Sequence, residues 1–211
     1  MSVRQLVYLA LASAIVMVLG MLVLDAPIAR AFGDVTDSPL DHALAQVLDV
    51  TDRVVLLLWP PKEWLAIALV VLGAIAWRFH TRAGATLVLM GLTHAVSRTF
   101  GGYLKTGLGR LRPSEALARG HVGDSWAWDD GFAFPSGHVA HYGAIAFALC
   151  LAVPRARVPA LIVLGAIACA RLVVDAHWLS DVAGAAALAA GAAALFGAML
   201  TRLGAPWSAW R

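Results

Sequence analysis

Two histidines and an aspartate in the second half of the chain are the residues best suited to covalent chemistry. His177 and Asp181 are four residues apart, a spacing that would stack them on one face of a helix. A carboxylate bonded to one ring nitrogen leaves the other nitrogen free to act as a nucleophile. His138 supplies a second imidazole that can protonate a leaving group. This set predicts attack by one histidine, assisted by the other acting as an acid.

Cations and small polar residues near these histidines predict an anion site. Lys105 and Arg112 are seven residues apart, so on one helix they would share a face and clamp a group from one side. Arg171 adds a third cation. Ser136 is a candidate N-cap, which would direct the backbone N–H of Gly137 toward a phosphate. The set fits phosphoryl transfer, and no His, Cys and Asp cluster has the spacing of metal ligands.

The three segments that hold these residues resemble the signature of the type 2 phosphatidic acid phosphatase family, also called lipid phosphate phosphatases. That signature is K-x6-RP, then PSGH, then SR-x5-H-x3-D. The chain has KTGLGRLRP at 105–113, PSGH at 135–138 and ARLVVDAHWLSD at 170–181, and the signature with its helices covers about residues 83–200. One position departs from the pattern, because Ala170 replaces the serine before the arginine. The change removes a hydroxyl contact to phosphate but none of the groups needed for attack or protonation.

The resemblance implies a role for each matching residue. His177 would attack phosphorus and form a phosphohistidine, and Asp181 would orient it. His138 would protonate the departing oxygen and then activate water. The family works without a metal or another cofactor, so none is expected. The resemblance also implies the residues that hold the phosphoryl oxygens, namely Lys105, Arg112, Ser136, Gly137 and Arg171.

Residues next to the motifs have alternative interpretations. Arg98 lies one heptad before the lysine of the first motif, so it either contacts a second phosphate or a head group or pairs with an acid inside the bundle. We favour the structural role. His141, one turn after His138, either lines the pocket or forms hydrogen bonds within the bundle. Trp126 and Trp128 are expected in a belt at the membrane interface rather than in a lid.

The composition shows which kind of protein carries these motifs. The chain has 211 residues, of which 61% are hydrophobic and 14% are charged, against roughly 25% charged in a soluble domain. So few charges exclude a disordered chain and a water-soluble globule, and the scattered basic residues exclude a nucleic-acid-binding patch. We therefore expect an integral membrane protein with a single domain, residues 1–211.

Apolar runs predict an all-α fold with six transmembrane helices in one bundle. The first run exceeds a typical signal-peptide core, so we expect an uncleaved span. After it, Ser38 and Pro39 can start an amphipathic helix in the first outward loop. This helix lies either on the membrane surface or against the bundle as a structured loop. The six runs are Leu6–Leu24, Trp64–Trp77, Ala83 to about Leu104, Val139–Val153, Val158 up to Arg171, and Val182–Leu200.

The distribution of arginine predicts the orientation in the membrane. With six spans, the N-terminus, the second and fourth connections and the C-terminus share one side, which carries arginine but no Asp or Glu. The positive-inside rule places that side in the cytoplasm. Both termini would be cytoplasmic, and the three motifs would face the periplasm of a bacterial inner membrane. The arginines are Arg4, Arg78, Arg82, Arg155, Arg157, Arg202 and Arg211.

These observations predict a metal-independent membrane phosphatase whose partners are the bilayer and a lipid phosphate or diphosphate. The resemblance suggests an undecaprenyl-diphosphate-type lipid first, and otherwise phosphatidylglycerophosphate, phosphatidic acid or lipid A. A phosphotransferase on the same scaffold would instead pass the phosphoryl group to another lipid or a sugar. A catalytically silent membrane protein for binding or transport is the third interpretation. The combination of His138, His177 and Asp181 argues against it.

Overall fold

The computed structural model describes residues 1–33, 38–55, 63–79, 81–121 and 130–207, and Trp126 and Trp128 lie outside these ranges. The described chain is helical and contains no strand, which confirms the all-α prediction. Its elements are α1 (Val3–Leu19), the π-helical turn η1 (Gly20–Leu24), α2 (Asp25–Gly33), α3 (Pro39–Val55), α4 (Glu63–Trp77), α5 (Arg82–Leu108), α6 (Pro113–Ala118), α7 (Gly137–Ala152), the 3-10 turn η2 (Pro154–Ala156), α8 (Arg157–Val173) and α9 (Leu179–Arg202).

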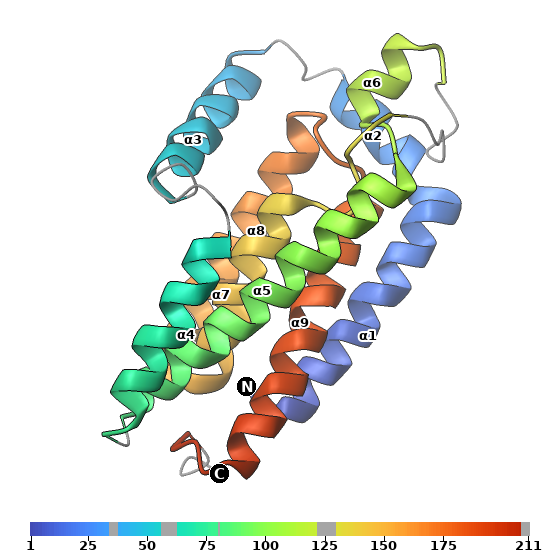
Figure 1. Ribbon diagram of the computed structural model, residues 1–211. Coiled ribbons are helices and arrows are strands. Elements are labelled where there is room, and N and C mark those ends of the chain that lie inside the picture. Colours follow the sequence, from blue (N-terminus) through green and yellow to red (C-terminus); the bar gives the residue numbers. More distant parts are fainter. Residues whose placement is uncertain (34–37, 56–62, 80, 122–129, 208–211) are drawn as a thin grey trace.

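A bundle of long helices forms the body of the molecule (Figure 1). The helix α9 packs against α1, α5 and α7, while α4 packs along α5 and α8 packs along α7. Small and aliphatic side chains fill the core between them, and many are alanines of α9. Small residues let the chain approach closely, since a Cβ on Gly184 of α9 would lie 2.7 Å from the ring of Phe134.

The two ends of the bundle differ in what they carry. The N- and C-termini lie at one end, and α2, α3 and α6 lie at the other (Figure 1). The start of α5 belongs to the first end, where the Arg82 guanidinium donates to the carbonyl of Pro206 at 3.3 Å. We name this the arginine end and define it by the start of α1, the α4–α5 connection, η2 and the end of α9. The opposite end holds the three sequence motifs and is named the motif end.

Several helices have the apolar surface of membrane proteins. Among the described residues, three helical stretches are long and apolar enough to cross a membrane, namely Val3–Phe32, Pro154–Val173 and Leu179–Arg202. The helices Trp64–Trp77 and Gly137–Ala152 are apolar but shorter. Large hydrophobic side chains are exposed along α1, α4 and α8, as on surfaces that face lipid. The count of six spans stays a prediction.

The amphipathic helix of the first outward loop begins where the sequence predicts. Pro39 is the first residue of α3, and the Ser38 hydroxyl accepts a hydrogen bond from the backbone N–H of Asp41 at 3.1 Å. Val47 is exposed and Leu48 is buried, so the apolar face of α3 is only partly covered. This exposure fits a helix at a membrane interface, and its placement there stays a prediction.

Candidate active site

The first motif lies across a helix end. The helix α5 stops at Leu108, and Gly109 follows in the left-handed conformation (φ 58°) with its N–H donating to the carbonyl of Lys105 at 3.1 Å. Arg112 lies beyond α5, at the N-cap of α6, where its backbone N–H donates to the Glu115 carboxylate at 2.8 Å. The expectation that Lys105 and Arg112 share a helical face is wrong, because a glycine ends the helix between them.

The PSGH segment is tied to the third motif through the backbone. Ser136 occupies the N-cap position of α7, as predicted, and its N–H donates to the carbonyl of Asp181 at 3.0 Å. Its hydroxyl makes no capping bond; it is fully buried and has no hydrogen-bond partner among the described residues. Gly137 and His138 form the first turn of α7, where backbone N–H groups have no acceptor within the helix. The Ser136 hydroxyl and these N–H groups together could donate hydrogen bonds to the oxygens of a phosphate.

The third motif turns between two helices. The helix α8 ends just before Asp175, whose φ of 49° bends the chain between Arg171 and His177, as their six-residue separation predicts. His177 lies in this turn and Asp181 lies in the first turn of α9, so stacking on a single helix is wrong. The four-residue spacing still brings them together, with Nδ1 of His177 3.5 Å from Oδ2 of Asp181.

Positive charge from the first and third motifs, and from Arg98 before the first, gathers near this pair. Lys105 and Arg171 both act electrostatically on His177. The structure therefore gathers at one place the cations that the sequence separates by up to 73 residues, from position 98 to position 171. The Lys105 ammonium interacts with the charge of one carboxylate and three guanidinium groups, which belong to Asp181, Arg98, Arg112 and Arg171.

Burial sets the protonation state of His177. Its side chain is 3% exposed, and desolvation lowers its pKa to about 4. The Asp181 carboxylate opposes this shift, while the nearby charges of Lys105 and Arg171 add to it. The imidazole is therefore neutral at pH 7, which is the form that a nucleophile requires. With Asp181 beside Nδ1, the nitrogen left for attack is Nε2.

Lys105 also fixes the chain that leads into the second motif. Its Nζ donates to the carbonyls of Phe132 at 2.6 Å and Ala133 at 3.3 Å. The N–H of Ala133 donates in turn to the carbonyl of Arg110 at 2.9 Å, so this strip runs along the end of the first motif. The Lys105 side chain and the backbone hydrogen bond between Ala133 and Arg110 thus connect the first motif to the segment that leads into the second.

The two residues with open roles lie in different surroundings. Arg98 donates from Nη1 to the carbonyl of Gly137 at 2.9 Å, a structural contact that supports the turn into α7. A Cβ on Gly137 would lie 2.9 Å from that same nitrogen, so a side chain here would make the Arg98 guanidinium shift. His141 is buried with Nδ1 2.8 Å from Nε2 of His94, and the two rings meet edge to face. The contact of His141 favours hydrogen bonding within the bundle, while the pairing of Arg98 with an acid stays a prediction.

A buried ion cluster behind Asp181 was missed by sequence reasoning. Nη1 of Arg110 donates to Oδ1 of Asp181 at 2.6 Å and to the Ser180 hydroxyl at 2.7 Å, while Nη2 donates to Oδ2 of Asp25 at 2.7 Å. All of these side chains are buried. The turn η1 brings Asp25 to this place by packing Gly20 against α9, where a Cβ would meet Ser180 Cβ at 3.0 Å.

Two signals in the sequence point to this cluster. Arg110 lies inside the first motif, and Asp25 directly follows the apolar run of 19 residues, where a carboxylate next to lipid is costly unless it is paired. The π-helical turn has no recognisable sequence signal, although such turns are frequent at functional sites.

Comparison with known families agrees with the motifs. Residues 82–204 match the PAP2 superfamily. This match covers more than half of the chain and includes all three motifs. Comparison with curated proteins and with solved structures gives no significant match. The resemblance predicted from the sequence is confirmed, and the chain belongs to the PAP2 superfamily.

Proposed function

We propose that this protein is an integral membrane phosphatase that hydrolyses a phosphate monoester or a diphosphate on a lipid. Membership of the PAP2 superfamily indicates a phosphatase acting on phosphate esters. The apolar helices favour a substrate that is itself held in a bilayer. The observation that carries the proposal is the buried pair of His177 and Asp181, 3.5 Å apart and near cations from the first and third motifs.

The first chemical step is attack by Nε2 of His177 on phosphorus. A nitrogen–phosphorus bond forms while the bond from phosphorus to the lipid oxygen breaks, which gives a phosphohistidine. Asp181, beside Nδ1, holds the tautomer and stabilises the positive charge that develops on the ring. His138 enters this step protonated and gives its proton to the departing oxygen.

The second step releases inorganic phosphate. His138, now neutral, accepts a proton from water, and the water oxygen bonds to phosphorus as the nitrogen–phosphorus bond breaks. His177 returns to its neutral form, and His138 is again protonated. With a diphosphate substrate, the same steps leave a lipid monophosphate.

Fixed donors stabilise the charge on the transferring group. The Ser136 hydroxyl has no partner among the described residues and lies at the N-terminus of α7, next to the Gly137 amide. Because these donors are placed before the substrate arrives, they favour the transition state without further reorganisation. The cations that complete this phosphate site are Lys105, Arg112 and Arg171.

We place the arginine end in the cytoplasm and the motif end at the outer face of the membrane, the periplasmic face in a bacterium. The lipid would then enter sideways from the outer leaflet. An undecaprenyl-diphosphate-type lipid is the first candidate, followed by phosphatidylglycerophosphate, phosphatidic acid and lipid A. An impermeant maleimide should label a cysteine placed at exposed Ser114 of α6 in intact cells, once Cys150 and Cys169 are replaced. Labelling only after lysis would reverse the orientation.

Phosphate release from these lipids in detergent, with EDTA present, tests the proposed chemistry. Release should continue in EDTA and stop in His177→Ala, while His42→Ala, which changes an exposed histidine of α3, should keep full activity. Activity that survives in His177→Ala, or that needs a divalent metal, would contradict the mechanism.

The same assay separates the alternative functions. A phosphorylated acceptor with little free phosphate would identify a phosphotransferase. If the folded protein hydrolyses none of the lipids, the result would favour a binding or transport role. A phosphohistidine trapped by rapid acid-free denaturation, and absent from His177→Ala, would support the covalent step.

A further inference from the structure

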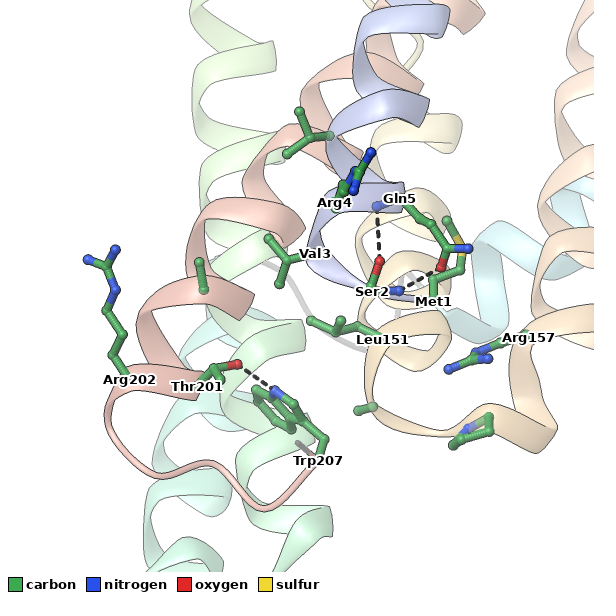
Figure 2. Close-up of a pocket in the computed structure, with 14 residues that line it drawn as sticks. Met1, Ser2, Val3, Arg4, Gln5, Leu151, Arg157, Thr201, Arg202 and Trp207 are labelled. Atoms are coloured by element: carbon green, nitrogen blue, oxygen red, sulfur yellow. Dashed lines mark hydrogen bonds between the residues drawn. The ribbon is translucent and has the colours of Figure 1, made fainter. Parts of the chain in front are cut away.

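A cavity of about 1000 Å³ opens at the arginine end (Figure 2). It is lined by the start of α1, the ends of α7 and α9, the start of α8 and Trp207. Along α9, 17 residues separate Asp181 of the His177 site from Ala198 of the cavity, which corresponds to about 26 Å of helix. The cavity is therefore distinct from the proposed catalytic centre.

Three arginines from different helices line this cavity: Arg4 of α1, Arg157 of α8 and Arg202 of α9 (Figure 2). Arg4 donates from Nε to the Tyr8 hydroxyl at 2.7 Å, and Arg157 donates from Nε to the Cys150 carbonyl at 2.9 Å. Neutral acceptors thus hold two of the guanidinium groups in place without cancelling their charge.

No Asp or Glu is among the described residues that line this cavity. Residues 1–24, 131–174 and 182–211, which include every residue lining the cavity, contain no Asp or Glu. The starts of α1 and α8 also lie here, and their helix dipoles add partial positive charge. The cavity therefore carries a positive potential that an anionic ligand would complement.

Apolar surface adjoins the charged cavity. Val3, Val7 and Leu151 line it, and large hydrophobic side chains continue to be exposed along α1 and α8. Trp207 adds an indole that donates to the Thr201 hydroxyl at 3.0 Å, an arrangement typical of the boundary between lipid and water. A ligand that fits both surfaces has an anionic head and long apolar chains.

We propose that this cavity binds an anionic phospholipid, with its head group in the positive potential of the cavity and its acyl chains along α1 and α8. Basic pockets between helices on the cytoplasmic side suit such head groups. A zwitterionic phospholipid binds less well because its ammonium group meets the same arginines. This proposal rests on the membrane placement given above and not on the phosphatase chemistry.

Native mass spectrometry of the full chain in detergent tests the proposal, with phosphatidylglycerol and phosphatidylcholine of identical acyl chains as probes. Phosphatidylglycerol should bind more tightly, and the double variant Arg4→Gln, Arg157→Gln should lose about fivefold in affinity for each arginine removed. The matched control is Arg155→Gln, since Arg155 is exposed and does not line the cavity. It should bind as the unchanged protein does. The charge-retaining variant Arg4→Lys, Arg157→Lys should still bind phosphatidylglycerol more tightly than phosphatidylcholine. It shows whether a loss of binding in the glutamine variant comes from lost charge or from misfolding.

Several results would overturn the proposal. These are equal binding of the two lipids, an equal loss in Arg155→Gln, or displacement of the lipid by millimolar inorganic phosphate, which would indicate a phosphate site. Loss of binding in Lys105→Gln alone would place the lipid at the motif end. Phosphate release by the Arg4 and Arg157 variants in detergent should be unchanged, so failure here is separable from failure of the phosphatase mechanism.

Discussion

Arg110 and Asp181 form a fully buried ion pair, with Nη1 2.6 Å from Oδ1. The other carboxylate oxygen of Asp181 accepts the backbone N–H of Trp178 at 2.9 Å and lies 3.5 Å from Nδ1 of His177. Arg110 is itself held by Asp25, which binds its Nη2 at 2.7 Å. The carboxylate that is expected to orient the nucleophile is therefore fixed from both sides, and the start of α2 takes part in fixing it.

Substitution of Asp25 should slow catalysis without changing substrate binding. Asp25→Asn removes the charge that holds Arg110, so the guanidinium can shift and carry Asp181 with it. A displacement of about 1 Å in a catalytic group costs up to about 100-fold, so we expect kcat to fall by about 10- to 100-fold with KM unchanged. Breaking a buried ion pair should also lower the free energy of unfolding by about 3–5 kcal/mol. Steady-state kinetics and thermal unfolding measure the two effects.

Two further variants show whether Asp25 is a positioning residue. Asp25→Glu keeps the charge and should recover part of kcat, whereas Asp49→Asn, on the exposed side of α3, should change neither quantity. A variant Asp25→Asn that unfolds more easily but keeps full kcat would leave Asp25 a purely structural role.

The acid limb of the pH profile should lie well below the usual range of histidine. Burial lowers the pKa of His177 to about 4, so the neutral nucleophile persists in the free enzyme until the pH falls toward that value. Because kcat/KM reports groups of the free enzyme, its acid limb is expected near pH 4 to 5. A limb near pH 6.5 would mean that His177 titrates normally.

The same shift predicts how stability depends on pH. An unfolded histidine has a pKa of about 6.5 and takes up its proton before the folded one does. Stability contributed by neutral His177 is therefore complete above pH 6.5 and is lost as the pH falls toward 4. The unfolding temperature of His177→Asn should fall less over this window than that of the unchanged protein.

Removing the Ser136 hydroxyl should weaken phosphate binding with little loss of stability. The hydroxyl is buried and makes no hydrogen bond among the described residues, so Ser136→Ala breaks none of the bonds seen there. A hydrogen bond to a charged group contributes about 1.5–3 kcal/mol, so kcat/KM should fall by about 10- to 150-fold. Ser114→Ala, at an exposed position of α6, is the matched control. Unchanged kinetics in Ser136→Ala would remove this residue from the phosphate site.

The sequence predicts the helical fold and the motif residues because both depend on local patterns. Apolar runs identify the helices, and the spacing of Arg171 and His177 indicates the bend that Asp175 supplies. The prediction that Lys105 and Arg112 share a helical face is wrong because Gly109 adopts a left-handed conformation and ends α5. A glycine can lie inside a helix, where it lowers stability, or at the C-terminal end of a helix. The sequence alone does not decide between these two positions.

The sequence marks Arg110 and Asp25 as unusual, but their pairing could not be predicted because 85 residues separate them. Asp25 and Ser180 are 155 residues apart and meet only when α1 and α9 pack together. Gly20 of the π-helical turn packs tightly against Ser180 in this arrangement, because a Cβ there would lie 3.0 Å from Ser180 Cβ. Long-range contacts of this kind carry no periodic signal.

Adding a methyl group at Gly137 should disturb the site, while the same change at Gly102 should not. A Cβ at Gly137 would lie 2.9 Å from Nη1 of Arg98 and 3.8 Å from Cε of Lys105, so Gly137→Ala pushes Arg98 off the carbonyl that it binds. We expect kcat/KM to fall by at least about tenfold, because the N–H groups at the start of α7 then move relative to the phosphate.

The matched control is Gly102→Ala, since a Cβ there meets no atom within 4 Å. Gly102 lies inside α5, where alanine is favoured over glycine by about 0.5–1 kcal/mol, so the control should be slightly more stable and fully active. Phosphate release and thermal unfolding of both variants make the comparison. Full activity in Gly137→Ala would show that the close approach of Arg98 to the PSGH turn is not needed for catalysis.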